Sequence, residues 1–186
     1  MKNGEIISFI NEIYIDYCLF LCNVKWEVKT DDCNYIEQCT LNFPFCCKMA
    51  SNIISSFLSL VTNYSFECHS IKMHMTEHSW AQCDDLDLII DITGFQFNSI
   101  NQVKKLFSNY MSEGNDIKEF LSQQKFIYNF CEYRKIIPQV NQNNSYIIDN
   151  TSLSKDKYYL SYASFFEFLK ENIKRFYDNS VLLSYE

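Results

Sequence analysis

The spacing of apolar residues changes twice along this chain, and these changes limit the folds it can adopt. Apolar residues recur every three or four positions over Glu5–Cys22 and again from about Cys46 to Thr62, which predicts two amphipathic helices. Tyr64–Met75 alternates like a strand, and His78–Gln82 is typical of a second one. Leu86–Thr93 is a nearly continuous apolar run, which favours a central strand.

The rest of the chain adds further segments of both kinds. Helical patterns are expected at Asn101–Tyr110, Asp116–Gln123 and Lys155–Tyr177, a strand at Lys125–Arg134, and loops at Asn23–Phe45 and Gln139–Asn150. Helices are therefore followed by strands and then by helices again. This order predicts the α+β class with a central antiparallel sheet.

Length and composition exclude several classes of protein. We expect a single domain, residues 1–186, because compact domains usually contain about 100–200 residues. A content of 47% apolar and 17% aromatic residues is too hydrophobic for a disordered chain. The net charge of −7 repels phosphate backbones and anionic membranes, and no apolar stretch reaches the roughly 20 residues of a membrane span. We therefore expect neither nucleic acid nor membrane as a partner.

Nine cysteines raise the question of disulfides or a metal. Their number is odd, and the N-terminus lacks the apolar run and cleavage site of a signal peptide. We therefore expect a reducing, cytoplasmic location, with secretion as an effector left open. The cysteines and the three histidines lack zinc-site spacings, so we expect no metal and no cofactor. Most of these thiols are expected to be small buried hydrophobic groups.

Three polar features could act together in chemistry. Cys46 and Cys47 stand at a predicted helix start, where unpaired N–H groups and the helix dipole stabilise a thiolate. His78 in one strand could take the thiol proton. Asp91, among apolar neighbours in the next strand, needs a partner and could orient that imidazole. The pattern is that of a nucleophile, its base and an orienting carboxylate.

Hairpin register links the histidine to the carboxylate. If the two strands pair around a turn centred between Asp84 and Asp85, His78 lies directly opposite Asp91. This expectation follows from the pairing of the two strands and does not depend on any assumed function.

Taken in order, Cys47, then His78-Ser79-Trp80, then Asp91-Ile92-Thr93 resemble the Cys…His-x-Trp…Asp-x-Thr pattern of the transglutaminase-like branch of papain-fold cysteine enzymes. Residues 43–97 are also similar to a group of bacterial and phage proteins. The resemblance implies a papain-like fold. In it, N-terminal helices, with the nucleophile at a helix start, pack on the sheet, and the C-terminal part is helical.

The resemblance also implies a role for each residue of the pattern. Cys47 is the expected nucleophile, His78 the general base and Asp91 the orienting carboxylate. Cys46 is the alternative nucleophile. Helix geometry favours Cys47, because Cys46 falls on the apolar stripe and Cys47 lies about 100° away from it.

Two further residues near the pattern are weaker candidates, and the function remains open between classes. Trp80 and Gln96 could contact substrate or brace the site, and Trp80 is more typical of a core wall. The expected function is acyl transfer from a peptide bond or glutamine carboxamide of a protein or peptide, by a peptidase, deamidase or transglutaminase. Phe45 stands where related sequences usually have Gly, which motivates the alternative of an inactive interaction or inhibitor module. An acetyl-transferring relative is a third possibility.

Overall fold

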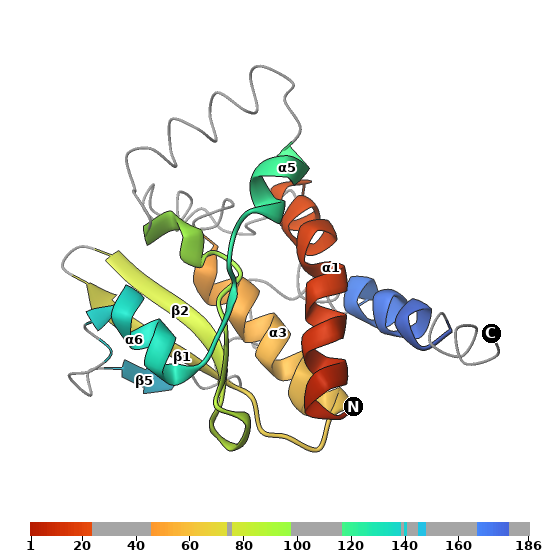
Figure 1. The fold of residues 1–186 in the computed structure, drawn as a ribbon, viewed down its shortest axis with the longest axis horizontal. Coiled ribbons are helices and arrows are strands. Elements are labelled where there is room, and N and C mark those ends of the chain that lie inside the picture. The colour runs from red at the N-terminus through yellow and green to blue at the C-terminus, as the bar shows by residue number, and fades with distance from the viewer. Residues whose placement is uncertain are drawn as a thin grey trace, which may run out of the picture.

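The fold is α+β, with an antiparallel sheet between helices (Figure 1). The computed structural model describes residues 1–23, 46–73, 76–97, 117–138, 140, 145–147 and 167–178, and the statements below concern these. The predicted α+β class with an antiparallel sheet is confirmed. Parts of several predictions, namely 24–45, Asn101–Tyr110 and 155–166, lie outside the described residues.

Five strands form the sheet in the order β4-β3-β2-β1-β5, and every neighbouring pair is antiparallel. The strands are β1 (Glu67–Met73), β2 (Thr76–Cys83), β3 (Leu88–Ile90), β4 (Ile127–Tyr128) and β5 (Ser145–Ile147). The central strand is thus β2, which carries His78. The predicted loop at 139–150 contains β5, so that prediction was wrong over these three residues.

Helix α3 (Cys47–Val61) lies between the sheet and helix α1 (Asn3–Asn23), as Figure 1 shows. The apolar stripe of α3, which includes Ile53 and Phe57, is fully buried in a core shared with α1 and one face of the sheet. Its serine-bearing side is buried as well, with Ser51 at 1% and Ser55 at 0% exposure. The sequence predicts one buried face for α3, whereas the sheet buries a second.

The other side of α1 is covered by a helix at 167–178. Phe168 stacks on Tyr17 and Phe20, and Phe176 meets Phe9 edge to face. Such aromatic pairs add about 0.5–1.5 kcal/mol each to the energy of apolar burial. The predicted C-terminal helix is therefore present over its described part, and Phe168 and Phe176 pack against the core, whereas Tyr177 is exposed.

The opposite face of the sheet is covered by helix α6 (Phe130–Ile136). The sequence predicts a strand over Lys125–Arg134, which is wrong beyond the two residues of β4. Asn129 caps the helix by accepting from the Glu132 N–H, while the Glu132 side chain accepts from the Asn129 N–H. This capping box starts a helix within an aromatic run that otherwise favours a strand.

The hairpin that joins β2 and β3 has a register two residues away from the predicted one. Ala81 pairs with Ile90 and Cys83 with Leu88, so a loop of four residues connects the strands. Asp87 at the end of this loop is left-handed, with a φ of 47°, a conformation that Asp tolerates better than most residues. Its carboxylate also accepts a hydrogen bond from the N–H of Phe130, the first residue of α6, at 2.8 Å.

Because the register differs, His78 is not directly opposite Asp91, which follows β3 rather than lying within it. A shift of two residues preserves the face on which each side chain points. The two residues are therefore diagonal neighbours on one face, and diagonal neighbours remain within reach of long side chains.

Candidate active site

Cys47 is the first residue of α3, and the start of this helix is left without a side-chain cap. The first hydrogen bond of the helix runs from the Ala50 N–H to the Cys46 carbonyl at 2.9 Å. The N–H groups of residues 47–49 therefore precede the helical hydrogen-bond ladder and form the positive end of the helix dipole. The Cys47 side chain lies at this end, with the residue 7% exposed.

Two side chains on α3 donate hydrogen bonds to the backbone of β2. Cys47 Sγ donates to the Glu77 carbonyl at 3.7 Å, and Ser51 Oγ donates to the Ser79 carbonyl at 2.9 Å. The pairs between β2 and β3 begin only at Ala81, so these carbonyls belong to a length of β2 that β3 does not cover. His78 lies between the two acceptors, and the start of α3 is thereby held against it.

The imidazole of His78 joins the thiol to the carboxylate. Its Nε2 lies 2.8 Å from Asp91 Oδ2, and both side chains are buried, at 1% and 0% exposure. Cys47 lies close enough to the imidazole to contribute to the raised pKa of His78. The carboxylate is bound through Nε2, and Nδ1 is a separate hydrogen-bonding atom of the same ring. The structure therefore brings together the three residues that the sequence pattern singled out.

The surroundings of His78 favour its charged form. Burial lowers the pKa of the imidazole, but the charge of Asp91 and its hydrogen bond oppose this effect, as does the nearby Cys47. The net result raises the pKa of His78 from 6.5 to about 10. An imidazolium held in this way is a suitable partner for a thiolate.

Asp91 is held from three directions. Tyr133 OH donates to Oδ2 at 2.7 Å, the Thr93 N–H donates to Oδ1 at 3.3 Å, and the Asp91 N–H donates to the Phe126 carbonyl at 2.8 Å. Gly94 leaves room for the carboxylate, because a Cβ at this position would lie 2.6 Å from Asp91 Oδ2.

Tyr133 is a site residue that the sequence reasoning missed. It is 1% exposed on α6, and burial together with the Asp91 charge raises the pKa of its phenol well above 10. The phenol is therefore a stable proton donor to Asp91. The capping box at residues 129–132 is the signal that could have placed Tyr133 on the buried side of a helix.

Trp80 forms a wall behind the histidine. The indole is fully buried, its ring lies 6.3 Å from that of His78 and 5.3 Å from that of Tyr133, and its Nε1–H donates to Gln82. These contacts place it among apolar groups that brace the imidazole. Gln96 falls in the 3-10 turn Gly94–Phe97, and its side chain lies outside the described part.

The structure also separates the two adjacent cysteines. Cys46 is 1% exposed and packs in the core shared by α1 and α3, whereas Cys47 meets β2. Among the other described thiols, Cys18, Cys68 and Cys83 are buried and Cys131 is exposed. Burial raises the pKa of Cys68 to about 12, so this thiol stays protonated.

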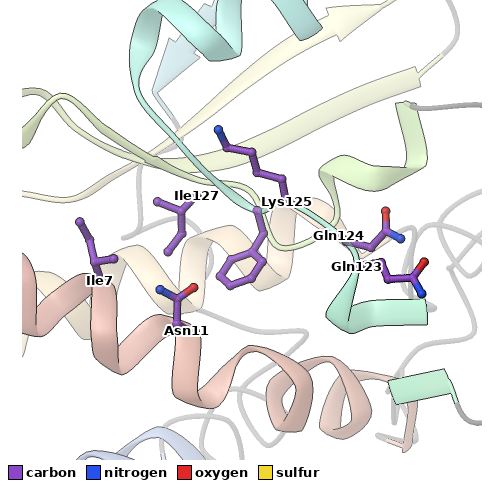
Figure 2. A pocket seen from close by; sticks show the side chains of 7 residues that line it. Ile7, Asn11, Gln123, Gln124, Lys125 and Ile127 are labelled. Atoms are coloured by element: carbon purple, nitrogen blue, oxygen red, sulfur yellow. The ribbon is translucent and has the colours of Figure 1, made fainter. Parts of the chain in front are cut away.

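A hollow of about 360 Å³ lies on another part of the surface, between α1 and the segment that follows α5 (Ile117–Ser122). Figure 2 shows Ile7 and Asn11 on one side of it and Gln123, Gln124 and Lys125 on the other. None of Cys47, His78 and Asp91 lines this hollow. Across the described ranges, no group of three or more His, Cys, Asp or Glu side chains could hold a metal, and no helix could cross a membrane.

Comparison of the chain with protein-family models, curated proteins and solved structures finds no match.

Proposed function

We propose that this protein is a cysteine-dependent acyl-transfer enzyme with Cys47 as nucleophile, His78 as general acid and base, and Asp91 as orienting carboxylate. The single observation that carries the proposal is the arrangement of the three residues: Cys47 begins an uncapped helix and bonds to the strand residue next to His78, and the imidazole of His78 bonds to the buried Asp91. A resemblance in motif order to the transglutaminase-like branch of papain-fold enzymes supports it.

The proposed reaction has two half-reactions. The Cys47 thiolate attacks the carbonyl carbon of a peptide bond or glutamine carboxamide, and a C–S bond forms while the carbonyl electrons move to oxygen. The N–H groups at the start of α3 are suited to stabilise that oxyanion. His78 gives its Nδ1 proton to the departing nitrogen, the C–N bond breaks, and a thioester remains on Cys47.

The second half-reaction restores the thiol. His78, now neutral, takes a proton from water or from an incoming amine, whose oxygen or nitrogen attacks the thioester carbonyl. The C–S bond breaks, and the sulfur leaves as the thiolate beside the re-formed imidazolium. Water gives a peptidase or deamidase, and an amine gives a transglutaminase. This chemistry requires no cofactor, and the proposed substrate is a protein or peptide.

The division of the ring nitrogens supports this assignment. Asp91 accepts from Nε2, which orients the ring and stabilises the imidazolium. In the proposed reaction Nδ1 exchanges the proton with the thiol. In serine-protease triads the nitrogens have the opposite roles, with the carboxylate at Nδ1. The chemistry requires only that one nitrogen serve each partner.

Alkylation by iodoacetamide tests the proposal without a known substrate. We expect Cys47 to be alkylated at pH 6–7 at least about tenfold faster than Cys131, which is exposed and free. His78→Gln should remove this advantage, because the thiolate loses its imidazolium partner. Alkylation at each cysteine is measured by peptide mass spectrometry. If Cys47 reacts no faster than Cys131 in the wild-type protein, the proposal is wrong.

A second candidate, an inactive domain that binds other proteins, is favoured by one observation. The three residues are 7%, 1% and 0% exposed, so little of the site meets solvent through the described part of the chain. In that case the hydrogen bonds would serve only to stabilise the fold. The same experiment separates the two functions, because a purely structural Cys47 gains no reactivity.

A further inference from the structure

Ser51 lies one helical turn after Cys47 and connects α3 to the same strand. Its hydroxyl donates to the Ser79 carbonyl at 2.9 Å, while the Cys47 thiol donates to the Glu77 carbonyl at 3.7 Å. These two acceptors are the residues on either side of His78. The alignment of the thiol with the imidazole is therefore set by two hydrogen bonds, of which the hydroxyl bond is the shorter.

Ionisation of Cys47 changes the balance between these bonds. A thiolate has no proton to donate, so the bond from Cys47 to the Glu77 carbonyl is lost when the proposed nucleophile forms. The sulfur then carries negative charge near a carbonyl oxygen, which is unfavourable. The hydroxyl of Ser51 remains as a donor from α3 to β2 in both protonation states.

The acceptor of this bond is itself well fixed. Ser79 is fully buried, it pairs with Ser70 of β1 in the sheet, and the two serine hydroxyls are hydrogen-bonded to each other. Ser51 is 1% exposed, so water does not compete for its hydroxyl. Because its acceptor is held within the sheet, this hydrogen bond keeps the first turns of α3 at a defined position relative to β2.

We infer that Ser51 is a positioning residue of the proposed active site: it holds the first turn of α3 in register with β2, so that the Cys47 thiolate stays aligned with His78. This inference rests on the proposed function and adds to it a residue that does not itself contact the reacting atoms. A small displacement of reacting groups is enough to slow a reaction severalfold or more.

Ser55 provides a matched control. It lies one turn after Ser51 on the same helix and is equally buried, but its hydroxyl donates to the Asn52 carbonyl of α3 itself, at 3.0 Å. Ser51→Ala and Ser55→Ala therefore each remove one buried hydroxyl from α3. Only Ser51→Ala removes a hydrogen bond between α3 and β2.

The experiment measures the iodoacetamide rate at Cys47, relative to Cys131, from pH 5 to 9 for the wild-type protein and both variants. We expect Ser51→Ala to lower the relative rate at pH 7 about fivefold. The midpoint of the pH profile should also shift, because a displaced thiolate loses its contact with the His78 imidazolium. Ser55→Ala should leave both quantities within about twofold or 0.2 pH units of the wild type. Urea unfolding of both variants verifies that they are folded.

The outcomes separate this inference from the proposed function. A fast Cys47 in the wild type, with an unchanged rate and midpoint in Ser51→Ala, overturns the inference and leaves the proposed function standing. Equal effects of the two substitutions also overturn it, because the loss would then follow from destabilisation of α3. A wild-type Cys47 with no advantage over Cys131 overturns both.

Discussion

Replacing Gly94 by alanine should disturb the site through one atom. The new Cβ would lie 2.6 Å from Asp91 Oδ2 and 2.8 Å from its Cγ, whereas ordinary contacts begin near 3.4 Å. The carboxylate must therefore move by about 0.8 Å, or the backbone must shift by as much. Either movement stretches the bonds from Tyr133 OH and His78 Nε2, which are now 2.7 and 2.8 Å long.

The size of the effect follows from these bonds. A hydrogen bond to a charged group contributes about 1.5–3 kcal/mol, and overpacking a rigid interior costs about 1–3 kcal/mol. We therefore expect Gly94→Ala to lower the free energy of unfolding by roughly 2–5 kcal/mol. The pKa of His78 should also fall from about 10 towards its ordinary value of 6.5, because the weakened contact with Asp91 no longer offsets burial.

Urea unfolding at pH 7 measures the first effect, and an NMR titration of the His78 ring measures the second. Gly4→Ala is the control, because a Cβ at Gly4 in α1 meets nothing within 4 Å and should change stability by at most about 1 kcal/mol. If Gly94→Ala unfolds at the wild-type urea concentration and His78 titrates as before, the carboxylate is not confined as described.

Two further predictions concern the same buried groups. The pKa of His78 is raised in the folded state, so its stabilising contribution is complete below about pH 6.5 and is lost as the pH rises through about 10; Asp91→Asn should flatten this part of a plot of unfolding free energy against pH. A wild-type curve no steeper than that of Asp91→Asn would contradict this. Tyr133→Phe should lower the unfolding free energy in urea by about 1.5–3 kcal/mol, and an unchanged value would show that the phenol does not stabilise the Asp91 carboxylate.

The sequence predicted that His78 lies near Asp91, and this prediction holds although the predicted hairpin register was wrong. The assumed hairpin register was wrong by two residues, yet a two-residue shift returns every side chain to the same face of the strand. The helix angle between Cys46 and Cys47 likewise predicted which thiol faces the core, because α3 is regular from its first turn.

Other parts of the site depend on contacts that local patterns do not encode. Tyr133 bonds to Asp91, which is 42 residues away in the sequence. The aromatic residues around Tyr133 predicted a strand, whereas the structure has a helix that begins with a capping box. Ser51 finds its acceptor only because β3 ends before it can cover that part of β2. Such contacts are set by tertiary packing, which overrides local propensity.

The contact between Asp87 and Phe130 ties the loop between β2 and β3 to the start of α6, so this loop is not an independent connector. Surface loops usually accept insertions and exchange between proteins. In this loop an inserted residue would displace the Asp87 carboxylate from the first turn of α6, and α6 carries the phenol that holds Asp91. Loop exchange at this hairpin is thus expected to be poorly tolerated, and engineered variation should be directed to other surface segments.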